Sequence, residues 1–224
     1  MVNADFFTRC ALVSVDFQES EKPAPVMDVD LPPDWKMMGF TAEDVNAANT
    51  FAWEVGLPNA RKVLTACREA ALPRVFIHWG YLFADGMDLD PLIRTMMIRN
   101  HGTDYKKWHG HIDQPGSLPP NNFQIQQDEY VIPKTAQDAF ESSNLGFVLA
   151  NLGVIHLILM GGHTEACLGK TAASAKRRGF RTLCVSDATT NARESTRVRG
   201  IQEAQFDYTI TSAELIQLLS SKTA

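Results

Sequence analysis

Short apolar runs alternate with amphipathic segments along most of this chain. Residues 10–16 (CALVSVD) are apolar and β-branched and end in an acid, a pattern that predicts a β-strand. Residues 154–162 (VIHLILMGG) are apolar almost throughout, which is typical of a strand buried on both faces of a sheet. Further strands are expected at residues 74–79, 129–134, 181–188 and 208–211.

Helices are predicted between these strands, because apolar residues there recur with helical spacing. The expected helices cover residues 61–71, 143–153, 164–178, 195–205 and 212–221. Ser143 is the expected N-cap of the second helix and Gly153 its expected stop. Strands separated by helices of this length form parallel βαβ units. The sequence therefore predicts an α/β fold with three α-β-α layers around a doubly wound, mainly parallel, Rossmann-like sheet.

Two regions fit this alternation poorly, residues 19–58 and residues 80–128. Both are long and are rich in proline, aromatic residues and methionine. Loops of this length inside a compact domain are usually lids, binding loops or subunit contacts. We expect them to cover a pocket or a neighbouring subunit, within a single domain that spans residues 1–224.

Composition narrows the class of protein further. The chain has 224 residues, of which 45% are hydrophobic, and a net charge of −5 without any basic run. That balance disfavours a nucleic-acid partner. The apolar stretches are too short to span a bilayer, and the first residues lack the layout of a signal peptide. We expect a cytoplasmic protein that acts on a small molecule.

Four cysteines are scattered along the chain without CxxC spacing, which argues against a disulfide framework and a zinc ribbon. Cys10, Cys67 and Cys184 lie within apolar periodic segments, so we expect them in the core. Cys167 differs, because it lies where an apolar strand ends and a helix of small residues begins.

Polar side chains follow three of the expected strands. Asp16 ends the first strand, Lys134 ends the strand at 129–134, and Cys167 lies just beyond residues 154–162. Sites in doubly wound sheets gather beyond the carboxyl ends of the strands, so these three can meet. With Thr164 as N-cap, Cys167 lies where the helix dipole favours a thiolate.

A cysteine, a carboxylate and a lysine together suit acyl transfer. Asp16 can take the thiol proton and later return it to a leaving amine, while Lys134 orients the carboxylate and stabilises the shifting charge. Main-chain N–H groups at the same turn can hold an oxyanion. Asp187, after residues 181–186, is interpreted as ordering a turn rather than taking part in the chemistry.

Three segments, ALVSVDFQ, VIPKTAQDAF and LILMGGHTEACLGKTAASAKRRGFRTLCVSDAT, together resemble the isochorismatase-like cysteine hydrolase superfamily. The matching positions, over roughly residues 10–190, are Asp16, Gln18, Lys134, Ala139, Phe140, Gly161, Thr164, Cys167, Asp187 and Ala188. The resemblance implies a cis peptide between Gly162 and His163. It also implies an oxyanion hole made by the N–H groups of His163 and Cys167, and a dimer or tetramer.

Two sequence features, the presence of Cys167 and the lack of an Asp-x-His motif, indicate which branch of this superfamily the chain resembles. Isochorismatases proper usually lack the cysteine, so Cys167 favours hydrolysis of C–N bonds. Nicotinamidases carry an Asp-x-His metal motif after the second strand, where this chain reads IHWGYLFADGMDLD. We expect no metal and no cofactor. His109 and His111, with His101 upstream, have spacing that can bind a metal but are interpreted as a lid feature.

Substrate contacts are expected around the ends of the first two strands and the nucleophile turn. Phe17, Trp79 and Tyr81 are candidates for apolar walls, although they can equally pack the roots of the loops. Gln18, His163 and Glu165 are candidates for polar contacts.

The resulting hypothesis is a cysteine hydrolase of linear amide or ureido/carbamoyl C–N bonds that works through a covalent acyl-enzyme. Two alternatives stay open. One is an isochorismatase-type ether or ester hydrolase in which Cys167 is incidental, and the other is a non-catalytic binding protein on the same fold.

Overall fold

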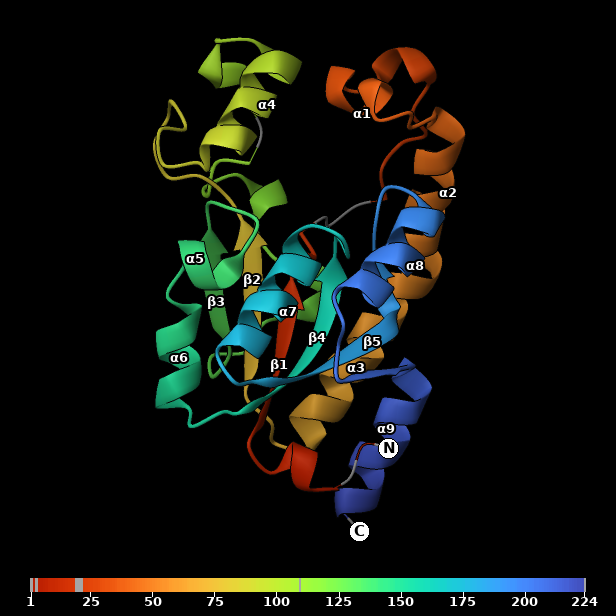
Figure 1. Ribbon diagram of the computed structural model, residues 1–224, viewed down its shortest axis with the longest axis vertical. Coiled ribbons are helices and arrows are strands. Elements are labelled where there is room, and N and C mark those ends of the chain that lie inside the picture. The colour runs from red at the N-terminus through yellow and green to blue at the C-terminus, as the bar shows by residue number, and fades with distance from the viewer. Residues whose placement is uncertain (1, 3, 19–21, 109, 224) are drawn as a thin grey trace.

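One parallel sheet organises the chain, of which the computed structural model describes residues 2, 4–18, 22–108 and 110–223. The strand order is β3-β2-β1-β4-β5-β6, and every neighbouring pair is parallel (Figure 1). The strands are β1 (Cys10–Val15), β2 (Arg74–Trp79), β3 (Tyr130–Lys134), β4 (His156–Gly162), β5 (Arg181–Thr190) and β6 (Tyr208–Ile210). The expected α/β fold with a doubly wound sheet is confirmed.

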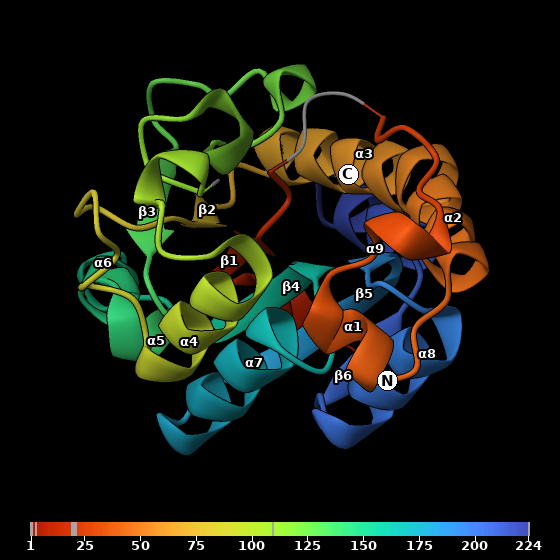
Figure 2. The same cartoon turned by 90° about the horizontal axis from the view of Figure 1, so that it is seen from above.

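Helices cover both faces of the sheet (Figures 1 and 2). The helices are α1 (Pro33–Met37), α2 (Ala42–Phe51), α3 (Leu57–Glu69), α4 (Pro91–His101), α5 (Ala139–Ser142), α6 (Leu145–Asn151), α7 (Cys167–Arg177), α8 (Glu194–Glu203) and α9 (Ser212–Thr223). Leu12 of β1 lies in the core beneath α3 and α9, and its neighbours Ala11 and Val13 lie in the core beneath α5, α6 and α7. Alternate residues of one strand thus fill two cores, as the period of a strand requires.

The strand order also fixes where a site can form. The chain runs outward from β1 to β2 and β3, then returns to place β4 on the other side of β1. Two adjacent strands whose connections leave in opposite directions open a crevice at their carboxyl ends. That crevice lies between the ends of β1 and β4, where Asp16 and Gly162 are found.

The two long regions contain more helix than expected. Residues 19–58 hold α1, α2 and the start of α3, and residues 80–128 hold α4 and short 3-10 turns. The first region was expected to be loop because of its prolines. Instead Thr41 caps α2, its hydroxyl accepting from the Asp44 N–H at 3.1 Å.

A π-helical segment (Ala52–Gly56) joins α2 to α3, so the chain is helical without a break from Ala42 to Glu69. Pro58 lies just after this segment. Proline inside a helix lacks an N–H and crowds the preceding turn. A wider turn before Pro58 relieves that crowding, and such π segments are frequent at functional sites.

The two long regions meet above the carboxyl edge of the sheet, where α1 lies beside α4 (Figure 2). Arg99 of α4 forms an ion pair with the buried Asp34 of α1. Arg193, just before α8, pairs with Asp44 of α2 at 2.9 Å. We call residues 22–58 and 80–128 the lids, because these contacts hold them over the crevice. No helix within the described ranges is both long enough and apolar enough to cross a lipid bilayer.

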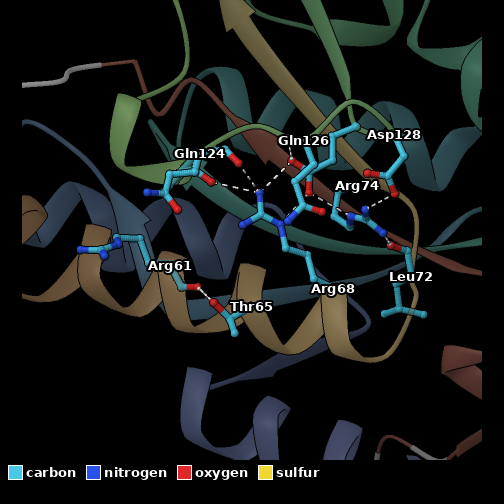
Figure 3. A network of polar contacts seen from close by, with 10 residues as sticks. Arg61, Thr65, Arg68, Leu72, Arg74, Gln124, Gln126 and Asp128 are labelled. Carbon is cyan, nitrogen blue, oxygen red and sulfur yellow. Dashed lines mark hydrogen bonds and ion pairs between the residues drawn. The ribbon is translucent and has the colours of Figure 1, made fainter.

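A buried ionic network fastens β2 and the approach to β3 against α3 (Figure 3). Arg68 donates from Nε and Nη2 to the two carboxylate oxygens of Glu129, each at 2.8 Å. Arg74 Nε donates to the same carboxylate at 3.1 Å. Burial alone would raise the pKa of Glu129, but hydrogen bonds from Arg68, the Gln126 N–H and Arg74 outweigh it and lower the pKa.

Replacing Glu129 with Gln tests this network. The variant leaves Arg68 without its charged partner and Arg74 paired only with the exposed Asp128, so the free energy of unfolding should fall by about 3 kcal/mol at pH 7, measured by urea denaturation. Because the pKa of Glu129 is lowered on folding, its contribution is present above the ordinary pKa of about 4.3 and is lost as the pH falls below that value. The difference between the variant and the parent should therefore shrink in acid.

Glu203→Gln is the matched control. Glu203 pairs with Arg199 at 3.7 Å, and both side chains are exposed. Exposed pairs contribute about 0–1 kcal/mol, so this variant should be nearly neutral. Equal losses in the two variants would contradict a special role for the buried network.

Candidate active site

Asp16, Lys134 and Cys167 come together at the carboxyl edge of the sheet. Lys134 Nζ lies 2.8 Å from Asp16 Oδ2 and 3.2 Å from Cys167 Sγ. The three residues come from the end of β1, the end of β3 and the start of α7. More than a hundred residues of chain separate Asp16 from the other two, and the parallel sheet brings them into contact.

The backbone aims the Asp16 carboxylate at this point. Asp16 has φ = +53°, a left-handed conformation that Asp tolerates better than most residues. Its N–H donates to the Ile77 carbonyl at 2.8 Å, which ties the turn to β2. The side chain presents Oδ2 to Lys134, while Oδ1 is buried and has no hydrogen-bond partner in the described part of the chain.

Lys134 is fully buried and uses all three donors of its ammonium group. They face Asp16 Oδ2, Cys167 Sγ and the Ala136 carbonyl, the last at 3.0 Å. Burial by itself lowers the pKa of Lys134. The charges of Asp16 and Cys167 and the hydrogen bonds to them outweigh burial, so the pKa is raised and the ammonium stays charged.

Cys167 is the first residue of α7, and the expected capping by Thr164 is wrong. The residue before the helix is Ala166, and the Thr164 hydroxyl donates to the Arg197 carbonyl at 3.0 Å. Thr164 is fully buried beneath α8, so its side chain fastens the turn to that helix.

The expected thiolate is also not favoured in the free protein. Burial raises the pKa of Cys167 to about 12; the Asp16 carboxylate adds to this effect and Lys134 opposes it. The sulfur therefore carries its proton at neutral pH, and a hydrogen bond between the Cys167 and Asp16 side chains adds to the raised pKa.

The turn before α7 has the backbone geometry of an anion site. The Gly162–His163 peptide bond is cis, as the resemblance implies. The His163 carbonyl accepts from the N–H groups of Ala166 and Leu168, each at 3.1 Å. The N–H of Cys167 lies between these donors and has no acceptor among the described residues. It is free to bind an oxyanion.

Glycine is required on this turn because neighbouring backbone comes too close for a side chain. A Cβ on Gly161, where φ is +110°, would lie 1.9 Å from the Val15 carbonyl oxygen. A Cβ on Gly162 would lie 2.7 Å from the Thr190 carbonyl oxygen, and closer still to the Thr190 hydroxyl. The two glycines let β4 end tightly between β1 and β5.

A cavity of about 670 Å³ opens in front of these groups. That volume suits a small-molecule ligand. The residues that line it are Asp16, Phe17, Gln18, Asn49, Ala52, Trp53, Leu57, Trp79, Gly110, Gln114, Gly116, Ser117, Gln137, Gly162, His163, Ala166, Cys167, Thr190 and Asn191. The lids thus contribute one side of the cavity, and the strand ends and the turn before α7 contribute the other.

Four of the expected substrate residues, Phe17, Gln18, Trp79 and His163, line this cavity. Trp79 and His163 line it and are partly exposed, whereas Phe17 lines it but is mainly a core residue in edge contact with Phe123.

Gln18 lines the cavity too, but its amide is engaged elsewhere. Nε2 donates to the Trp79 and Ser117 carbonyls at 2.7 and 3.0 Å, and Oε1 accepts from the Trp79 N–H at 3.0 Å. Gln18 therefore ties β1, β2 and a lid together rather than offering its amide donors to a ligand.

Tyr81 and Glu165 do not line this cavity. Tyr81 is buried within the second lid, in edge contact with Trp108. The Glu165 carboxylate accepts a hydrogen bond from Asn191 Nδ2, which holds the nucleophile turn against the end of β5. The structure therefore does not bring these two side chains to the cavity, and both contact neighbouring protein groups instead.

Several lining residues were missed from the sequence. Asn49 and Trp53 come from α2 and the π-helical segment, Gln137 follows β3, and Asn191 follows β5. Asn191 and Gln137 lie just beyond strand ends, a signal that could have found them. The helical face that carries Asn49 and Trp53 has no such local signal.

The remaining candidates have structural roles. Cys10, Cys67 and Cys184 are buried in the core, as expected. The Asp187 carboxylate accepts from the N–H and the hydroxyl of Ser212, both at 2.7 Å, and so orders the start of α9.

The histidines form no metal centre in the part of the chain that the structure describes. His111 Nε2 lies 3.1 Å from the Leu82 carbonyl oxygen, within a lid. His109, the other half of the HxH pair, lies outside the described residues.

The comparisons with known proteins fit this geometry. The model of the isochorismatase domain matches residues 10–214, so the chain belongs to the isochorismatase family of hydrolases. A search of curated proteins found no match.

Solved structures share the fold at low sequence identity. A cysteine hydrolase from Pseudomonas syringae pv. phaseolicola has a TM-score of 0.71 at 18% identity, over 96% of this chain and 93% of the other. An isochorismatase family protein from Burkholderia thailandensis gives 0.66 at 20%, over 95% and 96%. N-carbamoylsarcosine amidase from Thermoplasma acidophilum gives 0.62 at 21%, over 92% and 97%.

The pKa of Cys167 gives a test of the site. Alkylation by iodoacetamide, followed by peptide mass spectrometry, should show Cys167 reacting more slowly at pH 7 than a free thiol of pKa about 8.5. Asp16→Asn removes a negative charge and leaves Lys134 to favour the thiolate, so the pKa should fall and alkylation should accelerate. Cys184, buried and with its pKa raised to about 12, is the internal control. An unchanged rate at Cys167 in the variant would show that Asp16 and the sulfur are not coupled.

Proposed function

We propose that this protein is a cysteine hydrolase that cleaves an amide or ureido/carbamoyl C–N bond of a small molecule through an acyl-enzyme on Cys167. The observation that carries the proposal is the contact of Lys134 with both Asp16 and Cys167 beside a cavity of ligand size. A nucleophile, a proton acceptor and a fixed positive charge are the groups that acyl transfer needs.

The proton of the thiol moves when the substrate binds. Asp16 Oδ1 accepts the proton from Cys167 as the sulfur attacks the carbonyl carbon of the substrate. The carbonyl oxygen becomes an oxyanion held by the N–H groups of His163 and Cys167. The C–N bond then breaks, the leaving nitrogen takes the proton from Asp16, and a thioester remains.

Water completes the cycle. Asp16 takes a proton from a water molecule while the oxygen of that water attacks the thioester carbon. The bond between this carbon and the sulfur then breaks. The proton returns from Asp16 to the sulfur, and the acid product departs. Lys134 keeps its charge throughout, because its raised pKa holds the ammonium while negative charge passes between Asp16 and Cys167.

A neutral thiol in the resting protein agrees with this scheme. The raised pKa of Cys167 makes the sulfur less reactive toward alkylating agents in the resting protein. It also means that the thiol still carries the proton that Asp16 accepts in the first step. The Thermoplasma structure of similar fold is named as an amidase of an N-carbamoyl compound, which supports C–N hydrolysis.

The two alternatives make different use of the sulfur. An ether or ester hydrolase with an incidental cysteine would not require the contact between Lys134 Nζ and Cys167 Sγ. A binding protein would not require the buried ion pair of Lys134 and Asp16 beside a cysteine. The contacts of Cys167 with Lys134 and the cavity favour the cysteine hydrolase. A cytoplasmic location and a dimer or tetramer remain predictions.

Variants of the three residues test the proposal. Cys167→Ala, Asp16→Asn and Lys134→Met should each lower kcat by about 10³-fold or more, because they act as one unit. The measurement is ammonia release from a panel of small amides, ureides and carbamoyl compounds, with circular dichroism to show that each variant is folded. Cys10→Ala, a change at a buried cysteine away from the cavity, is the control and should keep full activity.

Two results would contradict the proposal. Undiminished turnover by Cys167→Ala would favour the ether or ester hydrolase. Failure of the parent protein to hydrolyse any compound of the panel, with no acyl-enzyme detected by mass spectrometry, would favour the binding protein.

A further inference from the structure

The cavity has few charged side chains in its lining. Among its described lining residues, Asp16 is the one carboxylate, and neither lysine nor arginine is present. Asp16 is already neutralised by Lys134 at 2.8 Å. Burial lowers the pKa of His163, although Glu165 and Asp16 oppose this, so the imidazole is neutral at pH 7. The described lining therefore offers no net charge to a ligand.

The cations around the cavity are committed to other partners. Lys134 has its three donors occupied. Arg197, beside the end of β5, pairs with Glu194 and donates to the Ser186 carbonyl at 2.7 Å. Arg193 pairs with Asp44, and Arg99 pairs with Asp34. A carboxylate in the cavity would find no free counter-charge among these groups.

Part of the cavity wall is aromatic. Trp53 comes from the first lid and Trp79 from the end of β2, and both indoles line the cavity and are partly exposed. Leu57 and Ala52 extend this wall along the helix of the first lid. Such a surface suits the ring or hydrocarbon body of a ligand.

Two carboxamides on the wall have no hydrogen-bond partner in the described part of the chain. Asn49 of α2 and Gln137 after β3 both line the cavity, and both are partly exposed there. Their side chains can donate to and accept from an uncharged polar group. They contrast with Gln18, Gln114 and Asn191, whose amides are bound to the protein.

We infer that the substrate is an uncharged amide or ureide with an aromatic or aliphatic body, and that N-carbamoyl amino acids, which carry a carboxylate, are rejected. This inference rests on the proposed function and names its substrate class. Trp53 and Trp79 hold the body, and Asn49 and Gln137 bind uncharged polar groups of the ligand. An anion would lose its hydration here and gain no counter-charge.

A matched pair of ureides tests the inference. Phenethylurea and N-carbamoylphenylalanine differ by one carboxylate and are otherwise the same molecule. The neutral ureide should have a kcat/KM at least about 100-fold higher, since burial of an unpaired charge is strongly unfavourable. Binding of each compound to the Cys167→Ala protein, measured by calorimetry, should show the same preference without any turnover.

The two measurements separate the two claims. Tight binding of phenethylurea without hydrolysis by the parent protein would count against the proposed function and support the charge preference. Binding of N-carbamoylphenylalanine as tight as that of phenethylurea, or no binding of phenethylurea, would overturn the inference even if the chemistry is correct.

A charge introduced into the wall tests the cause. Asn49→Lys or Gln137→Lys places a cation in the cavity, so the ratio of kcat/KM for the anionic to the neutral ureide should rise by about 10-fold or more. Asn151→Lys adds the same charge at an exposed position at the end of α6 and should leave the ratio unchanged. Equal effects of the three substitutions would show that the lining does not determine the preference.

Discussion

The structure of the site depends on the buried ion pair between Lys134 and Asp16. A fully buried ammonium is stable only where its charge is met and its donors are filled, and here a carboxylate, a sulfur and a carbonyl do so. The pair fixes the end of β1 against the end of β3. It also keeps a carboxylate close to Cys167 while offsetting the negative charge that this carboxylate would otherwise present to a ligand.

The two tasks of the site belong to different parts of the chain. The sheet and the turn before α7 hold Asp16, Lys134 and Cys167, and close contacts with neighbouring strands leave no room for a side chain at Gly161 and Gly162. The lids shape the rest of the cavity through α2, the π-helical segment, Gly110, Gln114, Gly116 and Ser117. This division lets one chemistry serve different ligands, because the lids can change while the strand ends and the turn before α7 stay fixed.

Much of this arrangement could be predicted from the sequence. The strands could be predicted because their apolar runs are short and separated by helices. Asp16, Lys134 and Cys167 could be chosen as site residues because each lies at the end of a strand or just beyond it. Local pattern was not enough elsewhere. Thr164 has the sequence position of an N-cap, yet its hydroxyl donates to a carbonyl of α8. The protonation of Cys167 depends on its burial in the folded protein, which the local sequence does not reveal. Asn49 and Trp53 could not be identified as cavity residues, because the prolines of this region predicted a loop rather than the helix that carries them.

The wide turn at Ala52–Gly56 gives the first lid a particular evolutionary freedom. A π turn holds about one residue more than an α turn, so loss of a single codon within it would restore a regular helix. Both kinds of turn complete about one revolution, so the helix on the amino-terminal side of that deletion would keep nearly the same face toward the cavity. Asn49 would stay at the cavity wall while the lining at Ala52 and Trp53 changed, and Asp16, Lys134 and Cys167, held by the sheet, would keep their places. A one-residue change in length could thus alter the cavity wall locally without turning the rest of the lid.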